Sequence, residues 1–131
     1  MFFVELNVNP KQRNIGDCVV RAISLAMNKD YNLTYQELVN WSIQQGEGWL
    51  FNYHQSYGEY LVCNGCEVHR PFKIGRRKAR VYDLYNHPKF SNGTYVVLLK
   101  DHLTVVTGNH LYDTWDCSNK IIELIWEVKD V

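Results

Sequence analysis

The spacing of apolar residues changes once along this chain, and that change constrains the fold more than any other feature of the sequence. Up to about residue 63, apolar residues recur every three or four positions, as in helices with one buried face. From residue 67 onward, runs rich in valine, isoleucine, leucine and tyrosine follow one another, as in strands of a sheet. Helices first and consecutive strands second predict an α+β fold, with N-terminal helices packed on a C-terminal antiparallel sheet.

Three helices are expected in the first part of the chain. The first should begin after Asp17, a residue type that favours the N-cap position. A capping box from Thr34 to Glu37 predicts the start of the second helix, which runs to about Gln45. The third is expected over residues 52–63 and ends at Asn64 and Gly65. The buried face of the first helix is predicted to carry Val19, Ala22, Ile23, Ala26 and Met27.

Strands are expected over residues 94–99, 103–107, 110–115 and 121–128. The second and third of these flank Gly108 and Asn109, which accept the positive φ angles of a two-residue hairpin turn. These two strands should therefore pair as an antiparallel hairpin with a defined register.

Length and charge limit the classes of function. The chain has 131 residues, of which 46% are apolar, and no repeat or linker divides it, so a single domain over residues 1–131 is expected. Lys and Arg total 14, equal to Asp and Glu, which argues against a general binder of nucleic acid or of anionic membranes. No run approaches the length of a membrane span, and the first residues do not form a secretory signal, so a cytoplasmic protein is expected.

Cys18 is the first candidate for chemistry, because it would lie in the first turn of the first helix. Unpaired backbone N–H groups and the helix dipole favour a thiolate there. A thiol nucleophile also needs a base, and His102 lies at the entry to the predicted hairpin.

The hairpin register supplies a group that could orient His102. With Gly108 and Asn109 as the turn, Thr104 faces Asp113 on the neighbouring strand. His102 and Asp113 then share one face of the sheet as diagonal neighbours, roughly 7 Å apart at the backbone. Asp116 is a competitor for this role, but the same register puts its side chain on the opposite face.

A carbonyl under attack also needs a donor for the oxyanion that develops. Gln12 lies six residues before Cys18 in a polar loop and could donate from its amide, with the backbone N–H of Cys18 as the second donor. Asn14 is an alternative to Gln12, and the sequence does not separate the two.

These residues resemble the papain-like cysteine peptidases in order and in roles. Residues 14–23, Asn-Ile-Gly-Asp-Cys-Val-Val-Arg-Ala-Ile, are similar to the Gly-Asp-Cys helix start of small papain-like peptidases, many from bacteriophages and mobile elements, and of ovarian-tumour-type deubiquitinases. His102 with residues 112–116 resembles the second half of the small-peptidase pattern. The sequence departs from papain in lacking the Cys-Gly-Ser-Cys-Trp run and in having Asp113 where papain has an asparagine.

The resemblance implies a papain-like fold and a small phage-type peptidase, in which Cys18, His102 and Asp113 form the triad and Gln12 binds the oxyanion. The residues predict hydrolysis of an amide or isopeptide bond in a protein or peptide substrate, with no cofactor and no metal. The same residues would also serve acyl transfer to an acceptor other than water. The alternative is a binding or inhibitor protein on the same scaffold that acts on a host protein.

Other polar clusters have ordinary explanations. Cys63 and Cys66, followed by His69, have the spacing of half a zinc site, but the sequence holds no second half, so a helix end flanked by ordinary thiols is favoured. Cys117 lies among acidic neighbours and is expected to be a poor nucleophile.

Residues 70–80 contain six positive charges and no acid. Such runs are usually solvated loops, although contact with an acidic partner or nucleic acid stays open. The walls of a substrate cleft are harder to predict, and Trp49, Phe51 and Tyr53 are candidates that could equally belong to the core.

Overall fold

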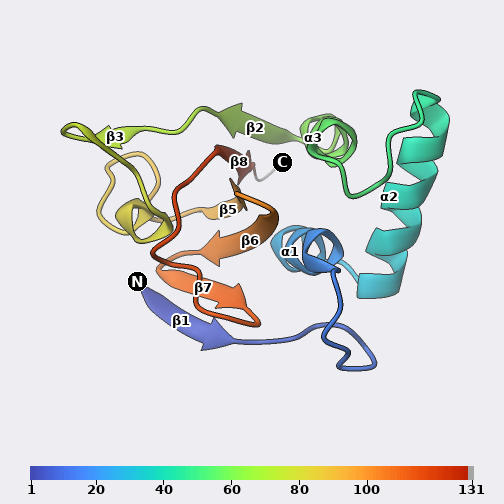
Figure 1. Ribbon diagram of the computed structural model, residues 1–131, viewed down its shortest axis with the longest axis horizontal. Coiled ribbons are helices and arrows are strands. Elements are labelled where there is room, and N and C mark those ends of the chain that lie inside the picture. Colours follow the sequence, from blue (N-terminus) through green and yellow to red (C-terminus); the bar gives the residue numbers. More distant parts are fainter. Residues whose placement is uncertain (130–131) are drawn as a thin grey trace.

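The computed structural model describes residues 1–129 and shows helices packed on a sheet, so the predicted α+β class is confirmed (Figure 1). The α-helices in this range are α1 (Cys18–Met27), α2 (Tyr31–Gln45) and α3 (His54–Cys63). A short 3₁₀ helix, η1, covers Val81–Leu84. Among the described residues, none of the helices combines the length and apolar character needed to cross a membrane.

The larger sheet contains β1 (Phe2–Glu5), β2 (Cys66–His69), β5 (Thr94–Leu99), β6 (His102–Thr107), β7 (His110–Asp113) and β8 (Leu124–Val128). Its spatial order within the described residues is β1-β7-β6-β5-β8-β2. Strands β5 to β7 form consecutive hairpins, and β8 pairs antiparallel with both β5 and β2. The central strands of this sheet are those that the sequence predicts.

The sheet is mixed, which corrects the prediction of an antiparallel sheet. Strand β1 pairs parallel to β7 at one edge, with Glu5 opposite Asp113. The Phe-Phe-Val-Glu segment is too short to show a period, and its partner lies near the other end of the chain, so local sequence carries no signal for this pairing.

Helix α1 begins directly after Asp17, as predicted, whereas α2 begins earlier than predicted. Asp17 occupies the N-cap position of α1, but its side chain makes no capping bond and is buried. Helix α2 begins at Tyr31, where the Asp30 side chain accepts a hydrogen bond from the N–H of Leu33. Thr34, the predicted N-cap, lies inside α2, and its hydroxyl donates to the Asp30 carbonyl. Asp30 is therefore the N-cap residue of this helix.

Two apolar clusters cover the two faces of the sheet. Leu103 and Val105 of β6 belong to the cluster under α1, together with the fully buried Ile23. Val106 of β6 and Val97 of β5 belong to a second cluster beneath η1 and the following loop. Burial on both faces explains why the central strands are continuous apolar runs instead of alternating ones.

The basic stretch is ordered, in contrast to the expected loop. Strands β3 (Lys73–Ile74) and β4 (Arg77–Lys78) form a small hairpin that extends from the body of the molecule (Figure 1). Gly75 in its turn has a φ of +63°, which a residue without Cβ adopts at no steric cost.

Candidate active site

His102 is the first residue of β6 and is placed by a tight turn. Leu99, the last residue of β5, pairs with His102 across the two turn residues Lys100 and Asp101. Asp101 adopts a φ of +57°, a conformation that aspartate tolerates better than most residues. The turn holds the imidazole at the end of the sheet, where only 11% of the side chain is exposed.

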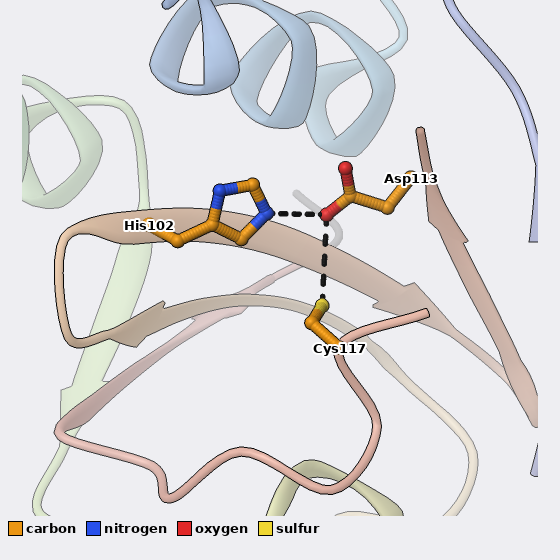
Figure 2. A group of neighbouring side chains, drawn as sticks. All are labelled: His102, Asp113 and Cys117. Carbon is orange, nitrogen blue, oxygen red and sulfur yellow. Dashed lines mark hydrogen bonds and ion pairs between the residues drawn. The ribbon is translucent and has the colours of Figure 1, made fainter. Parts of the chain in front are cut away.

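Asp113, the last residue of β7, lies next to His102 as the hairpin register predicts. Thr107 pairs with His110 and Val105 with Tyr112, so the turn has the two residues expected. The Nε2 atom of His102 is 2.7 Å from Oδ2 of Asp113 (Figure 2). This distance confirms the predicted proximity of the two side chains.

The His102–Asp113 pair is charged. Burial lowers the pKa of His102, but hydrogen bonds to Asp113, Cys117 and Cys18 and the charge of Asp113 together outweigh it and raise that pKa to about 11. Burial raises the pKa of Asp113, but the same bond and the charge of the imidazolium bring it down to about 2. His102 therefore carries a proton at neutral pH.

Cys18 is the first residue of α1 and lies beside His102. Burial raises the pKa of its thiol, but hydrogen bonding to His102, the N–H of Leu103 and the imidazolium charge together lower it below the ordinary value of 9.0. The second ring nitrogen of His102, Nδ1, is on the side of the ring that faces α1 (Figure 2). The sulfur and the carboxylate thus act on the same imidazole.

A cleft of about 640 Å³ gives access to the sulfur. Cys18 and Leu103 line it on one side and the N-terminal part of α3 on the other, where Tyr53 and Gln55 contribute. Tyr53, a candidate wall from the sequence, therefore lines this cleft, whereas Phe51 packs beside the helical core. Trp115 covers His102, with ring centroids 4.9 Å apart.

Asp113 is held in place by donors from three further residues. Arg21 Nη1 donates to Oδ1 at 3.2 Å, and the backbone N–H of Thr114 donates to the same oxygen at 2.7 Å. The thiol of Cys117, fully buried, donates to Oδ2 at 3.6 Å (Figure 2). Each donor restricts the carboxylate to the orientation in which it meets His102.

Arg21 also joins Asp113 to a second buried carboxylate. Its Nε atom donates to Oδ1 of Asp17 at 2.8 Å. Oδ2 of Asp17 accepts from Tyr31 at 2.7 Å and from Asn9 at 3.1 Å. Burial raises the pKa of Asp17, but these hydrogen bonds outweigh it and leave the pKa below its ordinary value. The Asp17 side chain is therefore part of the support of the site.

Arg21 is a site residue that the prediction from sequence missed. Only 8% of it is exposed, although it lies within a mostly apolar helix. The sequence did hold a signal for this role. Arg21 occupies a position on the buried side of the helix, four residues after Asp17, and buried charges are almost always paired with an opposite charge.

Gln12 is not among the residues that line the cleft beside Cys18. The Gln12 amide donates to the carbonyls of Asn7 and Asn9, 2.8 and 3.1 Å away. Asn14, its alternative, lines a different depression with Asn7 and Thr114. The oxyanion role of Gln12 stays a prediction, and it requires the amide to leave those bonds.

Two other amide side chains border the cleft at the start of α3, namely Asn52 and Gln55. The sequence offered only a weak signal for them, namely polar residues in the first turn of a predicted helix. The backbone N–H of Cys18 lies in the first helical turn, where it has no partner within the helix.

Asp116 is exposed and accepts a hydrogen bond from the N–H of Ser118. It lies beyond the end of β7, and His102 bonds Asp113 instead. The structure thus places Asp113, and not Asp116, behind the imidazole.

The remaining cysteines and histidines form no zinc half-site in the described part of the chain. Cys63 is exposed, Cys66 is buried against Met27, and His69 bonds Glu127 at 2.9 Å. Burial alone raises the pKa of the Cys66 thiol.

His102, Asp113 and Cys117 have donor atoms within 4.8 Å of one another and could approach a metal ion. Two ligands of one tetrahedral zinc are about 3.3 Å apart, given bonds of about 2.0–2.2 Å. The 2.7 Å separation of Nε2 and Oδ2 is shorter and corresponds to a hydrogen bond.

Neither a scan of known protein families nor searches of curated proteins and of solved structures finds a match to this chain. The chemistry of the site follows from its geometry. A thiol of lowered pKa at a helix start, an imidazole and a buried carboxylate are groups of the kind that nucleophilic thiol chemistry requires.

Proposed function

We propose that this protein is a thiol hydrolase of papain-like type that cleaves amide bonds in a protein or peptide. The observation that carries the proposal is that His102, whose Nε2 is 2.7 Å from Asp113, lines the same cleft as Cys18 at the start of α1. The packing of α1 on β6, with the nucleophile at the helix start, supports the papain-like assignment.

The reaction begins with the thiolate of Cys18. The sulfur attacks the carbonyl carbon, and the electron pair of the C=O bond moves to the oxygen, which the backbone N–H of Cys18 stabilises. His102 then gives a proton to the leaving nitrogen, the C–N bond breaks, and a thioester forms. Water attacks the thioester while His102 takes its proton, and the acid leaves as the thiolate is restored.

Asp113 orients the ring in this scheme. Its hydrogen bond to Nε2 directs Nδ1 toward Cys18 and stabilises the imidazolium. A second oxyanion donor would come from Gln12 after a loop movement, or from Asn52 or Gln55 across the cleft.

Two alternatives use the same scaffold. Acyl transfer would replace water with another acceptor and needs no change in the triad. A non-catalytic binding protein is favoured by a single observation, the engagement of the Gln12 amide in its own loop. That protein would keep the thiol without using it.

Alkylation kinetics separate an enzyme from a binder. Iodoacetamide should label Cys18 at pH 6.5 about tenfold faster than Cys63, an exposed thiol of the same chain. His102→Ala should remove this advantage, and peptide mass mapping of the labelled protein gives both rates. Equal rates at Cys18 and Cys63 would contradict the proposal.

Hydrolysis is the second arm of the test. The protein is incubated with a proteome-derived peptide mixture, and new termini are mapped by mass spectrometry. Cleavage should be present with the unaltered protein and absent with Cys18→Ala. A reactive Cys18 without any cleavage would favour acyl transfer or binding.

A further inference from the structure

A second hollow, of about 890 Å³, lies beside His102. It does not include Cys18 among its described lining residues, yet it shares Leu99, Asp101, His102 and Glu123 with the cleft that does. The two hollows therefore adjoin at His102, with Cys18 on one side and the second hollow on the other, and the pair is called the groove below.

The second hollow is strongly basic. Its cationic lining residues are Lys73, Lys78, Arg80, Lys100 and Lys120. They come from the β3–β4 hairpin, the residue before η1, the β5–β6 turn and the loop before β8. Segments distant in the sequence thus gather positive charge at one place in a protein whose formal net charge is zero.

These charges are largely uncompensated. Among residues 1–129, none of the four lysines has a carboxylate within 4.0 Å. The acids of the hollow, Asp101 and Glu123, also line the Cys18 cleft and so lie at the junction near His102. Positive charge thus dominates the part of the groove away from the sulfur.

Apolar side chains form much of the remaining lining. They include Phe72, Trp115, Ile121 and Ile122, of which Trp115 and Ile121 are 41% and 42% exposed. A concave site with apolar walls and a basic rim suits a peptide that combines apolar contacts with acidic side chains. Nucleic acid instead needs an extended basic surface that follows the phosphates.

We propose that this hollow binds the leaving-group side of a polypeptide substrate and selects acidic residues there. The proposal rests on the function proposed above, because His102 delivers its proton to the leaving nitrogen. The amine half of the substrate must therefore lie on the His102 side of the groove, and the acyl half beside Cys18. Acidic residues of the amine half then reach the lysines of the second hollow, beyond Asp101 and Glu123.

Equilibrium binding tests the hollow without any turnover. The probes are three fluorescein-labelled heptapeptides of one sequence that carry three Glu, three Gln or three Lys, and a twelve-residue oligothymidylate. In Cys18→Ala protein at low ionic strength, fluorescence anisotropy should show the Glu peptide binding at least about fivefold more tightly than the Gln peptide. The Lys peptide should bind most weakly.

Two matched pairs of charge reversals test whether the preference for the Glu peptide arises in the second hollow. Lys78→Glu with Lys120→Glu should remove the preference for the Glu peptide. Lys11→Glu with Arg13→Glu makes the same change of net charge in the exposed N-terminal loop and should leave the preference intact. A preference that survives the first pair, or disappears equally with both, would overturn the proposal, as would tighter binding of the oligothymidylate than of the Glu peptide.

Cleavage mapping with the unaltered protein places the acidic residues relative to the cut bond. Acidic residues should be enriched on the C-terminal side of the cut, and the enrichment should fall with Lys78→Glu and Lys120→Glu. Cleavage with no such enrichment would overturn this inference and leave the hydrolase intact. Selective Glu-peptide binding without cleavage would support the basic hollow as an acidic-peptide site and contradict the hydrolase.

Discussion

Asp113 connects more of the site than any other carboxylate described above. It accepts from His102 and Cys117 through one oxygen and from Arg21 and Thr114 through the other. Only 3% of the side chain is exposed, so each lost bond would leave a buried polar group unsatisfied. The residue therefore combines an orienting role with a structural one.

Asp113→Ala should lower kcat by at least about a hundredfold, since the imidazole loses both its orientation and its counter-charge. Asp113→Asn should retain more activity, because an amide oxygen can still accept from His102 Nε2. Steady-state kinetics on a cleaved peptide check both values.

Asp116→Ala is the matched control for these variants. Its exposed carboxylate caps the N–H of Ser118 and does not reach the imidazole, so turnover should be unchanged. Loss of activity in Asp116→Ala together with a fully active Asp113→Ala would mean that Asp116 orients His102.

Residue positions were predictable where strand register fixes them. The two turn residues Gly108 and Asn109, with alternation along the strands, are enough to place Asp113 near His102. The loop before α1 has no comparable constraint. Gln12 adopts a φ of +54° and bonds its own loop, which depends on local turns that the sequence pattern does not encode.

At the scale of elements, α1 carries both the proposed nucleophile and, one turn later, the arginine that joins the helix to Asp113. Cys18 is at its first position, and Arg21 follows on the turn that faces β7. The guanidinium joins the helix to Asp113 across 92 residues of sequence, so it fixes the helix relative to the hairpin.

Arg21→Met should destabilise the protein by about 3–5 kcal/mol, because it leaves Asp17 and Asp113 without their shared cation. Arg21→Lys should recover part of this stability, because lysine restores the positive charge but cannot bond both carboxylates with the planar geometry of a guanidinium. Urea denaturation followed by tryptophan fluorescence measures the free energy of unfolding of each variant.

Arg13→Met is a suitable control, since Arg13 is exposed in the loop before α1 and its loss should change stability by less than about 0.5 kcal/mol. If Arg21→Met were equally neutral, the buried ion pairs would contribute nothing to the docking of α1.

The elements that the sequence predicted have either a strong internal pattern or, as in α2 and α3, a recognisable signal at one end. The apolar face of α1 and the buried runs of β5 and β6 each hold enough residues to show a period. Strand β1 and the β3–β4 hairpin contain four and two residues per strand, and their pairing depends on distant or polar neighbours. Such segments take their structure from the tertiary context.

At the scale of the whole molecule, the His102–Asp113 pair makes stability depend on pH in two directions. Asp113 has a folded-state pKa of about 2, below its ordinary 3.8, so its contribution is present above pH 3.8 and is lost as the pH falls toward 2. His102 has a folded-state pKa of about 11, above its ordinary 6.5, so its contribution is complete below pH 6.5 and declines toward pH 11.

The difference in unfolding free energy between Cys18→Ser protein and Cys18→Ser, His102→Gln protein should therefore be largest between about pH 4 and 6.5. The Cys18→Ser background removes the titration of the thiol. Urea denaturation at pH 3, 5.5 and 9 provides the comparison. If this difference in unfolding free energy stays constant from pH 5.5 to 9, the contact with Asp113 does not raise the folded-state pKa of His102.

The connection between α1 and the β6–β7 hairpin also has a consequence for folding kinetics. His102 and Asp113 are 11 residues apart in one hairpin, a short loop that closes fast, whereas Cys18 reaches them only through a long-range contact. During refolding, the imidazole and carboxylate can meet before the nucleophile arrives. The lowered pKa of the Cys18 thiol, which depends on His102, would then be established in the last step, so newly made chains would lack the proposed activity until α1 has docked.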